Sequence, residues 1–214
     1  MKTLFITFEG LEGSGKSSQI SSVSEHYIQQ GKKVIRTREP GGTVLAEKMR
    51  DLLIHQQEEK LSQRAELLLM LAARAQHVDE LIQKNMGIAD LILCDRFTDS
   101  TLAYQGGGRG MNMDLLKNLN AQATGGITPD ITFLMDLKVA DSQARIEHRK
   151  KRNHKSKKVD RFESETIAFH ERIREVYLKL AEAEPERFLV LNAIEKPQVI
   201  FQKMIDHIEK RINL

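Results

Sequence analysis

A glycine-rich loop between two contrasting segments constrains the fold of this chain more than any other feature. Gly10, Gly15, Lys16 and Ser17 have the spacing of G-x-x-x-x-G-K-[ST], the Walker A phosphate loop. A short apolar segment precedes the loop and a helix-forming segment follows it, the order that such a loop requires. Glycines let backbone N–H groups turn toward an anion, and the helix N-terminus adds partial positive charge. The loop predicts a nucleoside triphosphate site, and an ordinary glycine turn with an exposed lysine is the less favoured alternative.

Two side chains of the loop have predicted roles. The Lys16 ammonium would reach the β- and γ-phosphates, and the Ser17 hydroxyl would ligate Mg²⁺. The residues expected to hold the triphosphate are Gly10, Leu11, Glu12, Gly13, Ser14, Gly15, Lys16 and Ser17.

Length and composition favour one globular domain that spans residues 1–214. The chain has 214 residues, of which 40% are hydrophobic and 29% charged, enough for a sizeable core. Its net charge of +3 is too small to indicate a nucleic-acid partner by itself. No apolar run has the length of a secretory signal or a membrane span, so we expect a cytoplasmic protein. The lone Cys94 lies in the apolar run LILCD and is expected to be a buried structural thiol.

Short apolar segments alternate with longer helical patterns along the chain. The predicted strands are 3–8, 33–37, 90–94, 131–135 and 187–191. The predicted helices are 16–30, 43–56, 61–85, 112–123, 139–152, 162–183 and 197–211. Parallel strands need crossover connections, so the alternation predicts an α/β fold with a parallel sheet covered by helices on both faces. Ligands of such sheets bind at the carboxyl ends of the strands.

Charged side chains stand at three of these strand ends. Glu9 follows the first strand, Arg38 lies just beyond the second, and Asp95 and Arg96 end the third. An aspartate after four apolar residues resembles a Walker B carboxylate, which binds Mg²⁺ directly or through water. Arg96 is expected to clamp a phosphate because a guanidinium grips phosphate oxygens with two N–H groups. The alternative is that Arg96 serves as the counter-ion of Asp95.

One arginine interrupts the apolar stripe of the predicted helix 61–85. The stripe, at helical spacing, consists of Leu67, Met70, Leu71, Arg74, Val78 and Leu81. Arg74 would either face a pocket, where a nucleobase carbonyl or a phosphate accepts its hydrogen bonds, or extend to solvent. The segment STLAYQGGGRG at 100–110 places hydroxyls, an amide and an aromatic ring before a triple glycine, and alone it reads as a flexible loop.

Six motifs in this order resemble the bacterial thymidylate kinase family: FEGLEGSGKS, TREPGGT, LAAR, CDRF, AYQGGGRG and VDRFE. The resemblance covers residues 3 to about 192. It implies a P-loop kinase fold with a five-stranded parallel sheet, a helical lid and a homodimer. It also implies transfer of the γ-phosphoryl group of ATP to dTMP, with Mg²⁺, which gives dTDP and ADP on the way to dTTP.

The same resemblance assigns residues to the acceptor. Glu9 and Asp95 would lie near the acceptor phosphate and Mg²⁺. The residues expected to bind dTMP are Glu9, Arg38, Met70, Arg74, Arg96, Thr101, Tyr104 and Gln105. Among these, Arg38 and Arg96 would contact the phosphate and Arg74 the thymine carbonyl. Thr101 and Gln105 would face the base edge, and Tyr104 would pack against the sugar. Met70 departs from the family, which commonly has phenylalanine there to stack on the base.

The phosphate loop contains no cation besides Lys16, so the charge that assists phosphoryl transfer has to come from elsewhere. Residues 145–161, the lid of the resemblance with Asp160 near its end, contain nine Lys or Arg residues. The predicted catalytic residues are Lys16, Asp95, Arg96, Arg149 and Arg152, with Arg149 preferred within the lid. Glu12 would pair with the closed lid. A solvated helix end or a nucleic-acid patch is the alternative interpretation of the basic run.

Other functions stay open at this point. Within enzymes, the chain would phosphorylate another nucleoside monophosphate or a nucleoside. A GTPase-like switch would share the phosphate loop, but the sequence contains neither N-K-x-D nor T-K-x-D, the signature that reads guanine. A nucleic-acid-dependent ATPase would use the basic run and bind DNA in a salt-dependent way. We expect neither a nucleic-acid partner nor a membrane.

Overall fold

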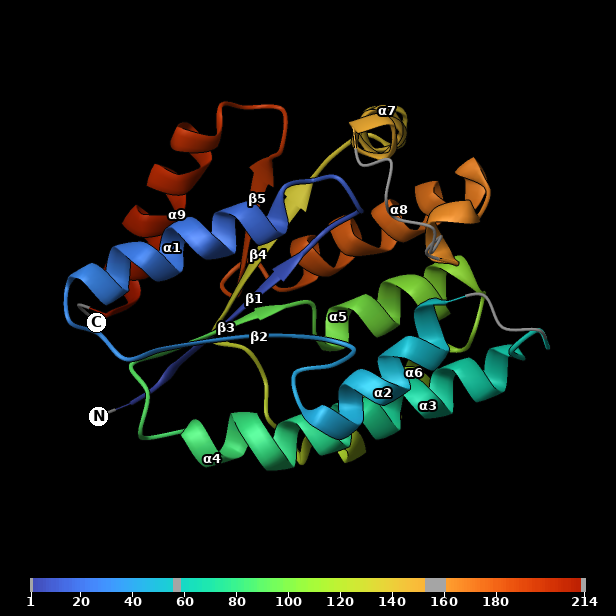
Figure 1. Cartoon of the computed structure of the whole chain (residues 1–214), viewed down its shortest axis with the longest axis horizontal. Coiled ribbons are helices and arrows are strands. Elements are labelled where there is room, and N and C mark those ends of the chain that lie inside the picture. The colour runs from blue at the N-terminus through green and yellow to red at the C-terminus, as the bar shows by residue number, and fades with distance from the viewer. Residues whose placement is uncertain (1, 56–58, 153–160, 213–214) are drawn as a thin grey trace.

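The computed structural model describes residues 2–55, 59–152 and 161–212. Five parallel strands form one sheet in the order β2-β3-β1-β4-β5 (Figure 1). Their bounds are β1 Leu4–Glu9, β2 Val34–Arg38, β3 Leu91–Asp95, β4 Ile131–Asp136 and β5 Phe188–Asn192. Each lies within one residue of its predicted position, so the predicted five-stranded parallel sheet is confirmed.

Helices cover both faces of the sheet, as predicted. Their bounds are α1 Lys16–Gln29, α2 Val44–Ile54, α3 Gln63–His77, α4 Gln83–Asn85, α5 Thr98–Thr101, α6 Met113–Thr124, α7 Val139–Arg152, α8 Ile167–Ala183 and α9 Pro197–Ile212, with π-helical η1 Val78–Ile82 and η2 Leu102–Gly108 and the 3₁₀ turn η3 Phe162–Ser164. Alternate side chains of β1 divide the core. Ile6 and Phe8 pack with α1 and α9 on one face, whereas Phe5 packs on the other with Val78 and Phe97.

Two predicted helices are more finely divided than the sequence indicates. The helix expected over 61–85 is α3, continued by the π turn η1 and the short α4. The helix expected over 162–183 begins as the 3₁₀ turn η3, and α8 starts afresh after Thr166, whose hydroxyl accepts from the Phe169 N–H.

The alternative that 100–110 is only a loop with a flexible triple glycine is wrong. Residues 98–108 are helical, and the triple glycine belongs to η2, which packs against α8. A Cβ atom on Gly107 would lie 2.8 Å from the Arg172 carbonyl oxygen, and one on Gly108 would lie 2.5 Å from the Phe169 ring. These glycines therefore permit close helix contact instead of providing a flexible hinge.

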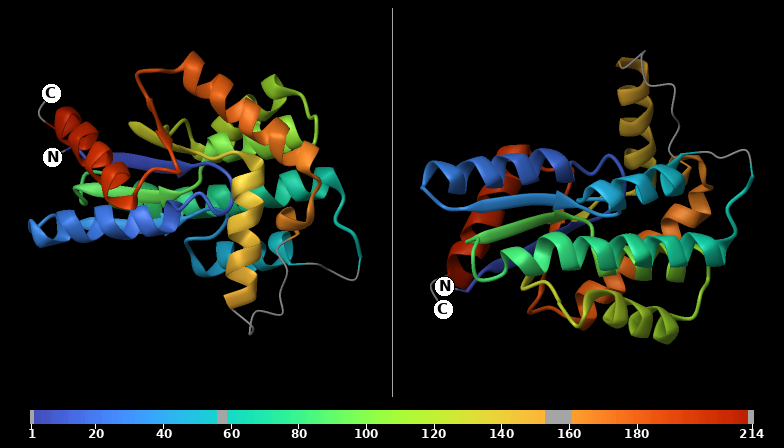
Figure 2. Two further views of the ribbon diagram at one scale, coloured as in Figure 1. Left: turned by 90° about the horizontal axis from the view of Figure 1, so that it is seen from above. Right: turned by 60° about the horizontal axis from the view of Figure 1, so that its bottom comes forward.

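The carboxyl ends of β1, β2 and β3 meet at one edge, where Arg38 is the cross-strand partner of Asp95. Helix α7 stands beyond this edge, away from the body of the sheet (Figure 2). Cys94 is fully buried, as predicted. Among the residues described, no helix combines the length and apolarity that crossing a membrane demands.

Candidate active site

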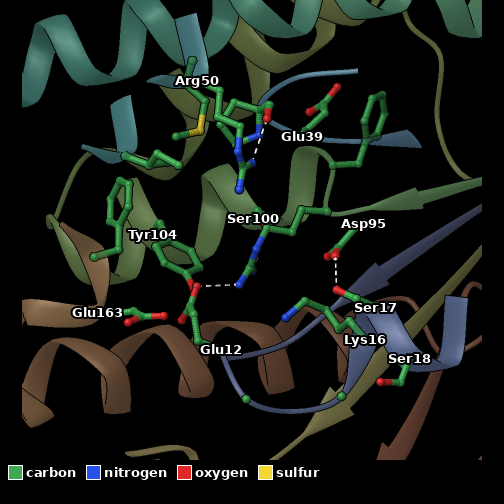
Figure 3. Close-up of a pocket in the computed structure, with 18 of the residues that line it drawn as sticks. Glu12, Lys16, Ser17, Ser18, Glu39, Arg50, Asp95, Ser100, Tyr104 and Glu163 are labelled. Atoms are coloured by element: carbon green, nitrogen blue, oxygen red, sulfur yellow. Dashed lines mark hydrogen bonds and ion pairs between the residues drawn. The ribbon is translucent and has the colours of Figure 1, made fainter. Parts of the chain in front are cut away.

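A pocket of about 500 Å³ opens at the carboxyl ends of the strands (Figure 3). It is bounded by the phosphate loop below, by the ends of β2 and β3, and by α2, α3, η2, α7 and η3. The predicted site residues that line it are Glu12, Gly13, Gly15, Lys16, Ser17, Met70, Arg74, Asp95, Arg96, Tyr104 and Arg149. Residues assigned to the triphosphate and residues assigned to the acceptor thus share one cavity.

The phosphate loop has the backbone that its glycines predict. Gly10, Gly13 and Gly15 have φ values of 129°, 75° and 96°, in the region that other residues rarely adopt. The Lys16 ammonium donates to the carbonyl oxygens of Gly10 and Leu11 at 2.9 and 3.0 Å. Burial lowers the pKa of Lys16 to about 8, and Arg96 adds to this effect. The lysine therefore lies folded over its own loop, ready to exchange carbonyl partners for phosphate oxygens.

Ser17 and Asp95 meet as predicted. The Ser17 hydroxyl donates to Asp95 Oδ2 at 3.1 Å. The other carboxylate oxygen, Oδ1, is buried and has no hydrogen-bond partner among the described residues. An unsatisfied carboxylate oxygen beside a hydroxyl fits Mg²⁺, which prefers few protein oxygen ligands and keeps several waters.

Glu12 binds two other residues of the pocket, and its pairing with a closed lid stays a prediction. Its carboxylate accepts from Arg96 Nη2 at 2.7 Å and from the Tyr104 hydroxyl at 2.8 and 2.9 Å, and the Arg96 guanidinium lies over the Tyr104 ring. Burial alone would raise the pKa of Glu12, but Arg96, Lys16 and the Tyr104 hydroxyl outweigh it and hold this pKa below its ordinary value. Glu12 therefore forms its ion pair with Arg96, and among the described residues no cation of α7 pairs with it. Arg96 thus has Glu12 as its ion-pair partner, which contradicts the alternative that Arg96 is the counter-ion of Asp95.

Glu9 lies beneath the pocket and does not border it. One oxygen accepts from the Phe97 N–H at 2.7 Å, and the other accepts from the hydroxyls of Ser100 and Tyr177 at 2.6 and 2.8 Å. Burial raises the pKa of Glu9 to about 7, and the nearby Asp99 contributes. Both oxygens of Glu9 already accept hydrogen bonds from the protein, and the described part of the structure shows no opening from Glu9 to the pocket. Direct contact of Glu9 with Mg²⁺ or with the acceptor therefore stays a prediction.

Arg74 is part of the pocket wall and is only 1% exposed, which excludes the extension to solvent. Its guanidinium donates to Glu39 Oε2, Thr101 Oγ1, Asn120 Oδ1 and the Phe97 carbonyl oxygen at 2.7, 2.8, 2.6 and 3.0 Å. A guanidinium has five N–H groups, so one N–H, on Nη2, remains for a ligand.

Met70 borders the pocket and also packs in the apolar cluster that contains Tyr104, so its position fits both contact with a base and packing in the core.

Besides Glu9, three predicted acceptor residues lie outside this pocket. Thr101 and Gln105 are buried behind its wall, where Thr101 accepts from Arg74 and Gln105 donates to Glu66 at 2.9 Å. Arg38 lines a neighbouring hollow of about 340 Å³ and forms an ion pair with Glu47. Ser17 and Asp95 border both hollows, so Arg38 approaches the same two groups from the other side.

The first half of the predicted lid is helix α7. Arg149 reaches the pocket and forms an ion pair with Glu163, which also pairs with Lys150 at 3.1 Å. The side chain of Arg152 and the whole of Asp160 lie outside the described residues.

Several pocket residues had no predicted role. Glu39 is buried between Arg74 and His77, Arg50 donates to the Pro40 carbonyl oxygen, and Glu163 holds the lid cation. Glu39 and Glu163 stand in the quoted motifs TREPGGT and VDRFE, so a charged residue inside a motif was the available signal. Their burial and pairing follow only from the fold.

Comparison with known proteins gives one consistent result. The family model described as thymidylate kinase matches residues 8–204. A thymidylate kinase from Desulfovibrio desulfuricans is 47% identical over 198 residues, which cover 91% of this chain and 90% of that protein. One from Protochlamydia amoebophila is 41% identical over 211 residues, 98% of this chain and 94% of that protein. The crystal structure of thymidylate kinase from Ehrlichia chaffeensis has a TM-score of 0.75 and 31% identity, and covers 97% of this chain and 99% of that one.

Proposed function

We propose that the chain, which belongs to the thymidylate kinase family, transfers the γ-phosphoryl group of ATP to dTMP in the pocket described, and so produces dTDP and ADP. One observation carries the assignment of the site. A single cavity is lined by Lys16 and Ser17 of the phosphate loop, by Met70 and Arg74 of α3, and by Arg96, whose guanidinium binds Glu12 of the same loop. A donor triphosphate and an acceptor monophosphate would therefore meet near Arg96.

The chemistry of the site is positioning and charge compensation. The backbone of the phosphate loop binds the triphosphate of ATP, and Lys16 turns from its carbonyl partners to the phosphate oxygens. Arg96 is held by Glu12 and stacked on Tyr104, so its guanidinium is already oriented when phosphate oxygens arrive. Ser17 and Asp95 would hold Mg²⁺, which supplies further positive charge against the phosphate oxygens.

The acceptor end of the pocket recognises the nucleoside. The remaining N–H of Arg74 would donate to a thymine carbonyl, and the Met70 thioether would lie against the face of the base. Tyr104, whose hydroxyl is bound to Glu12, presents its ring where the sugar would lie. These contacts are made in the ground and transition states alike, so they are expected to act mainly on KM for dTMP.

Arg149 is the proposed lid cation. Its ion pair with Glu163 is at the rim of the pocket, with half of the Arg149 side chain exposed, so the guanidinium can exchange the carboxylate for phosphate oxygens. Such a cation stabilises charge on the transferring group and is expected to act mainly on kcat.

The acceptor assignment is tested by ADP release with ATP, Mg²⁺ and a panel of dTMP, dUMP, UMP, CMP, AMP and GMP. We expect the highest kcat/KM for dTMP and little ADP without an acceptor. A higher kcat/KM for another monophosphate would overturn the substrate assignment. Rapid hydrolysis of ATP or GTP without an acceptor, or only with DNA, would support the switch or the nucleic-acid-dependent ATPase instead.

Assembly and location complete the proposal. Leu52 on α2 and Leu68 on α3 are half-exposed apolar side chains on two helices that pack together, which supports a homodimer that uses these helices. Light scattering should then give about twice the chain mass of 24.4 kDa. A cytoplasmic location agrees with the substrates, which are nucleotides.

A further inference from the structure

Two buried side chains, Glu39 and His77, and the half-buried Thr37 connect Arg74 to the end of strand β2. Glu39 accepts from Arg74 Nε through Oε2 at 2.7 Å, and its Oε1 lies 2.9 Å from His77 Nδ1. The other ring nitrogen of His77, Nε2, lies 2.6 Å from Thr37 Oγ1. His77 is fully buried, and Glu39 is at the upper wall of the pocket (Figure 3). The ring of His77 therefore stands directly behind the carboxylate that holds Arg74.

The hydrogen on Nδ1 follows from the state of Glu39. Burial alone would raise the pKa of Glu39, but Arg74 and His77 outweigh it and hold this pKa below its ordinary value. An ionised carboxylate only accepts hydrogen bonds. His77 Nδ1 therefore carries the hydrogen and donates to Glu39 Oε1.

The two oxygens of Glu39 thus serve two different donors. A carboxylate beside arginine commonly takes two parallel N–H groups, here Nε and Nη2. Here His77 holds Oε1, and Arg74 is joined to Glu39 only through Nε and Oε2, so the carboxylate is turned away from the second parallel bond to Nη2. That N–H is the single guanidinium hydrogen without a partner among the described residues.

We propose that His77 is a positioning residue for base recognition: by fixing the orientation of the Glu39 carboxylate through Oε1, it restricts Glu39 to the Nε–H of Arg74 and leaves the last N–H of Arg74 available to the carbonyl at position 4 of thymine. The inference rests on the proposed function and names the group that sets its selectivity. Tight packing keeps the ring in place, since a Cβ atom on Gly42 would lie 2.5 Å from both His77 Cδ2 and Thr37 Oγ1.

Two substitutions separate the two ends of the ring. The side-chain amide of His77→Asn has an N–H near the position of Nδ1, whereas His77→Gln has its polar group near the position of Nε2. Thr37→Val is the matched control, because it removes the partner of Nε2 and leaves the Nδ1 donor in place. The acceptors are dTMP and 5-methyl-dCMP, which differ only in the carbonyl or amino group at position 4 and its adjacent ring proton.

For His77→Gln we expect KM for dTMP to rise about 10-fold with kcat nearly unchanged, the loss typical of one hydrogen bond. The preference for dTMP over 5-methyl-dCMP in kcat/KM should narrow by a similar factor. His77→Asn and Thr37→Val should stay within about 3-fold of the parent protein in both quantities.

Equal losses in His77→Asn and His77→Gln, or lower thermal stability with unchanged preference, would overturn the inference. If the parent protein does not use dTMP, the proposed function fails. If it uses dTMP and the His77 variants keep its selectivity, only this inference fails. Should the variants not fold, ¹⁵N NMR of the parent protein decides: a hydrogen on His77 Nδ1 supports the inference, and its absence refutes it.

Discussion

The buried carboxyl of Glu9 makes the stability of the protein depend on pH in an unusual direction. Burial raises the pKa of Glu9 from its ordinary value of 4.5 to about 7 in the folded protein. Between these values the unfolded chain loses this proton while the folded protein keeps it. The hydroxyls of Ser100 and Tyr177 tolerate both forms, because a hydroxyl can donate to the carboxylate or accept from the protonated acid.

The sign and size of the effect follow from this difference. The folded state binds more protons between about pH 4.5 and pH 7, so the contribution of Glu9 to stability falls as pH rises through that window. Below this pH window the buried carboxyl is neutral and costs no stability. Above the window it is ionised in both states, and the loss of stability no longer changes with pH. A shift of this size corresponds to about 3 kcal/mol. We therefore predict that Glu9→Gln, neutral at every pH, gains up to about 3 kcal/mol relative to the parent protein between pH 5 and pH 8.

Urea unfolding at several pH values in a chelator-containing buffer measures this difference. Only its change with pH counts, because the substitution also alters hydrogen bonds at every pH. Glu25→Gln, at an exposed position of α1, controls for removal of a carboxylate. The reasoning would be refuted if the difference in unfolding free energy between Glu9→Gln and the parent protein stayed constant from pH 5 to pH 8. It would also be refuted if the parent protein became the more stable of the two as pH rose.

Three further predictions concern the pocket. Met70→Phe should lower KM for dTMP without a proportional rise in kcat, because an aromatic face stacks on the base in both ground and transition states; lower thermal stability with unchanged KM would place Met70 in the core alone. Tyr104→Ala should relax the selection of dTMP over its ribose analogue, whereas Tyr104→Phe should keep it; unchanged selection in the alanine variant would exclude the ring as the sugar gate. Arg149→Ala should reduce kcat about 10–100-fold, more than it raises KM for dTMP, because a lid cation acts on transition-state charge; a silent Arg149→Ala with a loss from Arg152→Ala would reassign the role.

The strands, the helices and the phosphate loop were predictable because each depends on residues that are near one another in the sequence. The strand before Gly10 and the helix after Lys16 follow from apolar runs and glycine placement, and the structure contains both. Arg74 in an apolar stripe correctly indicated an arginine that faces inward. In each case the residues that decide the outcome are neighbours in the sequence or lie one helical turn apart.

Features that depend on distant contacts were not predictable in the same way. The triple glycine reads as flexible until α8 is placed against it, and only then does a missing Cβ indicate contact. The partners of Glu12, Arg96 and Tyr104, lie 84 and 92 residues away along the chain, so the sequence did not indicate either contact. Glu39 shows no sign in the sequence that it would be buried between Arg74 and His77.

The transfer itself is tested most directly with ATP labelled in the γ-phosphate and with unlabelled dTMP. We predict that the label appears in dTDP in a one-to-one ratio with ADP, and that Lys16→Ala lowers the rate by at least about 100-fold. Label released as inorganic phosphate at a rate independent of dTMP would contradict the assignment of this pocket to phosphoryl transfer between nucleotides.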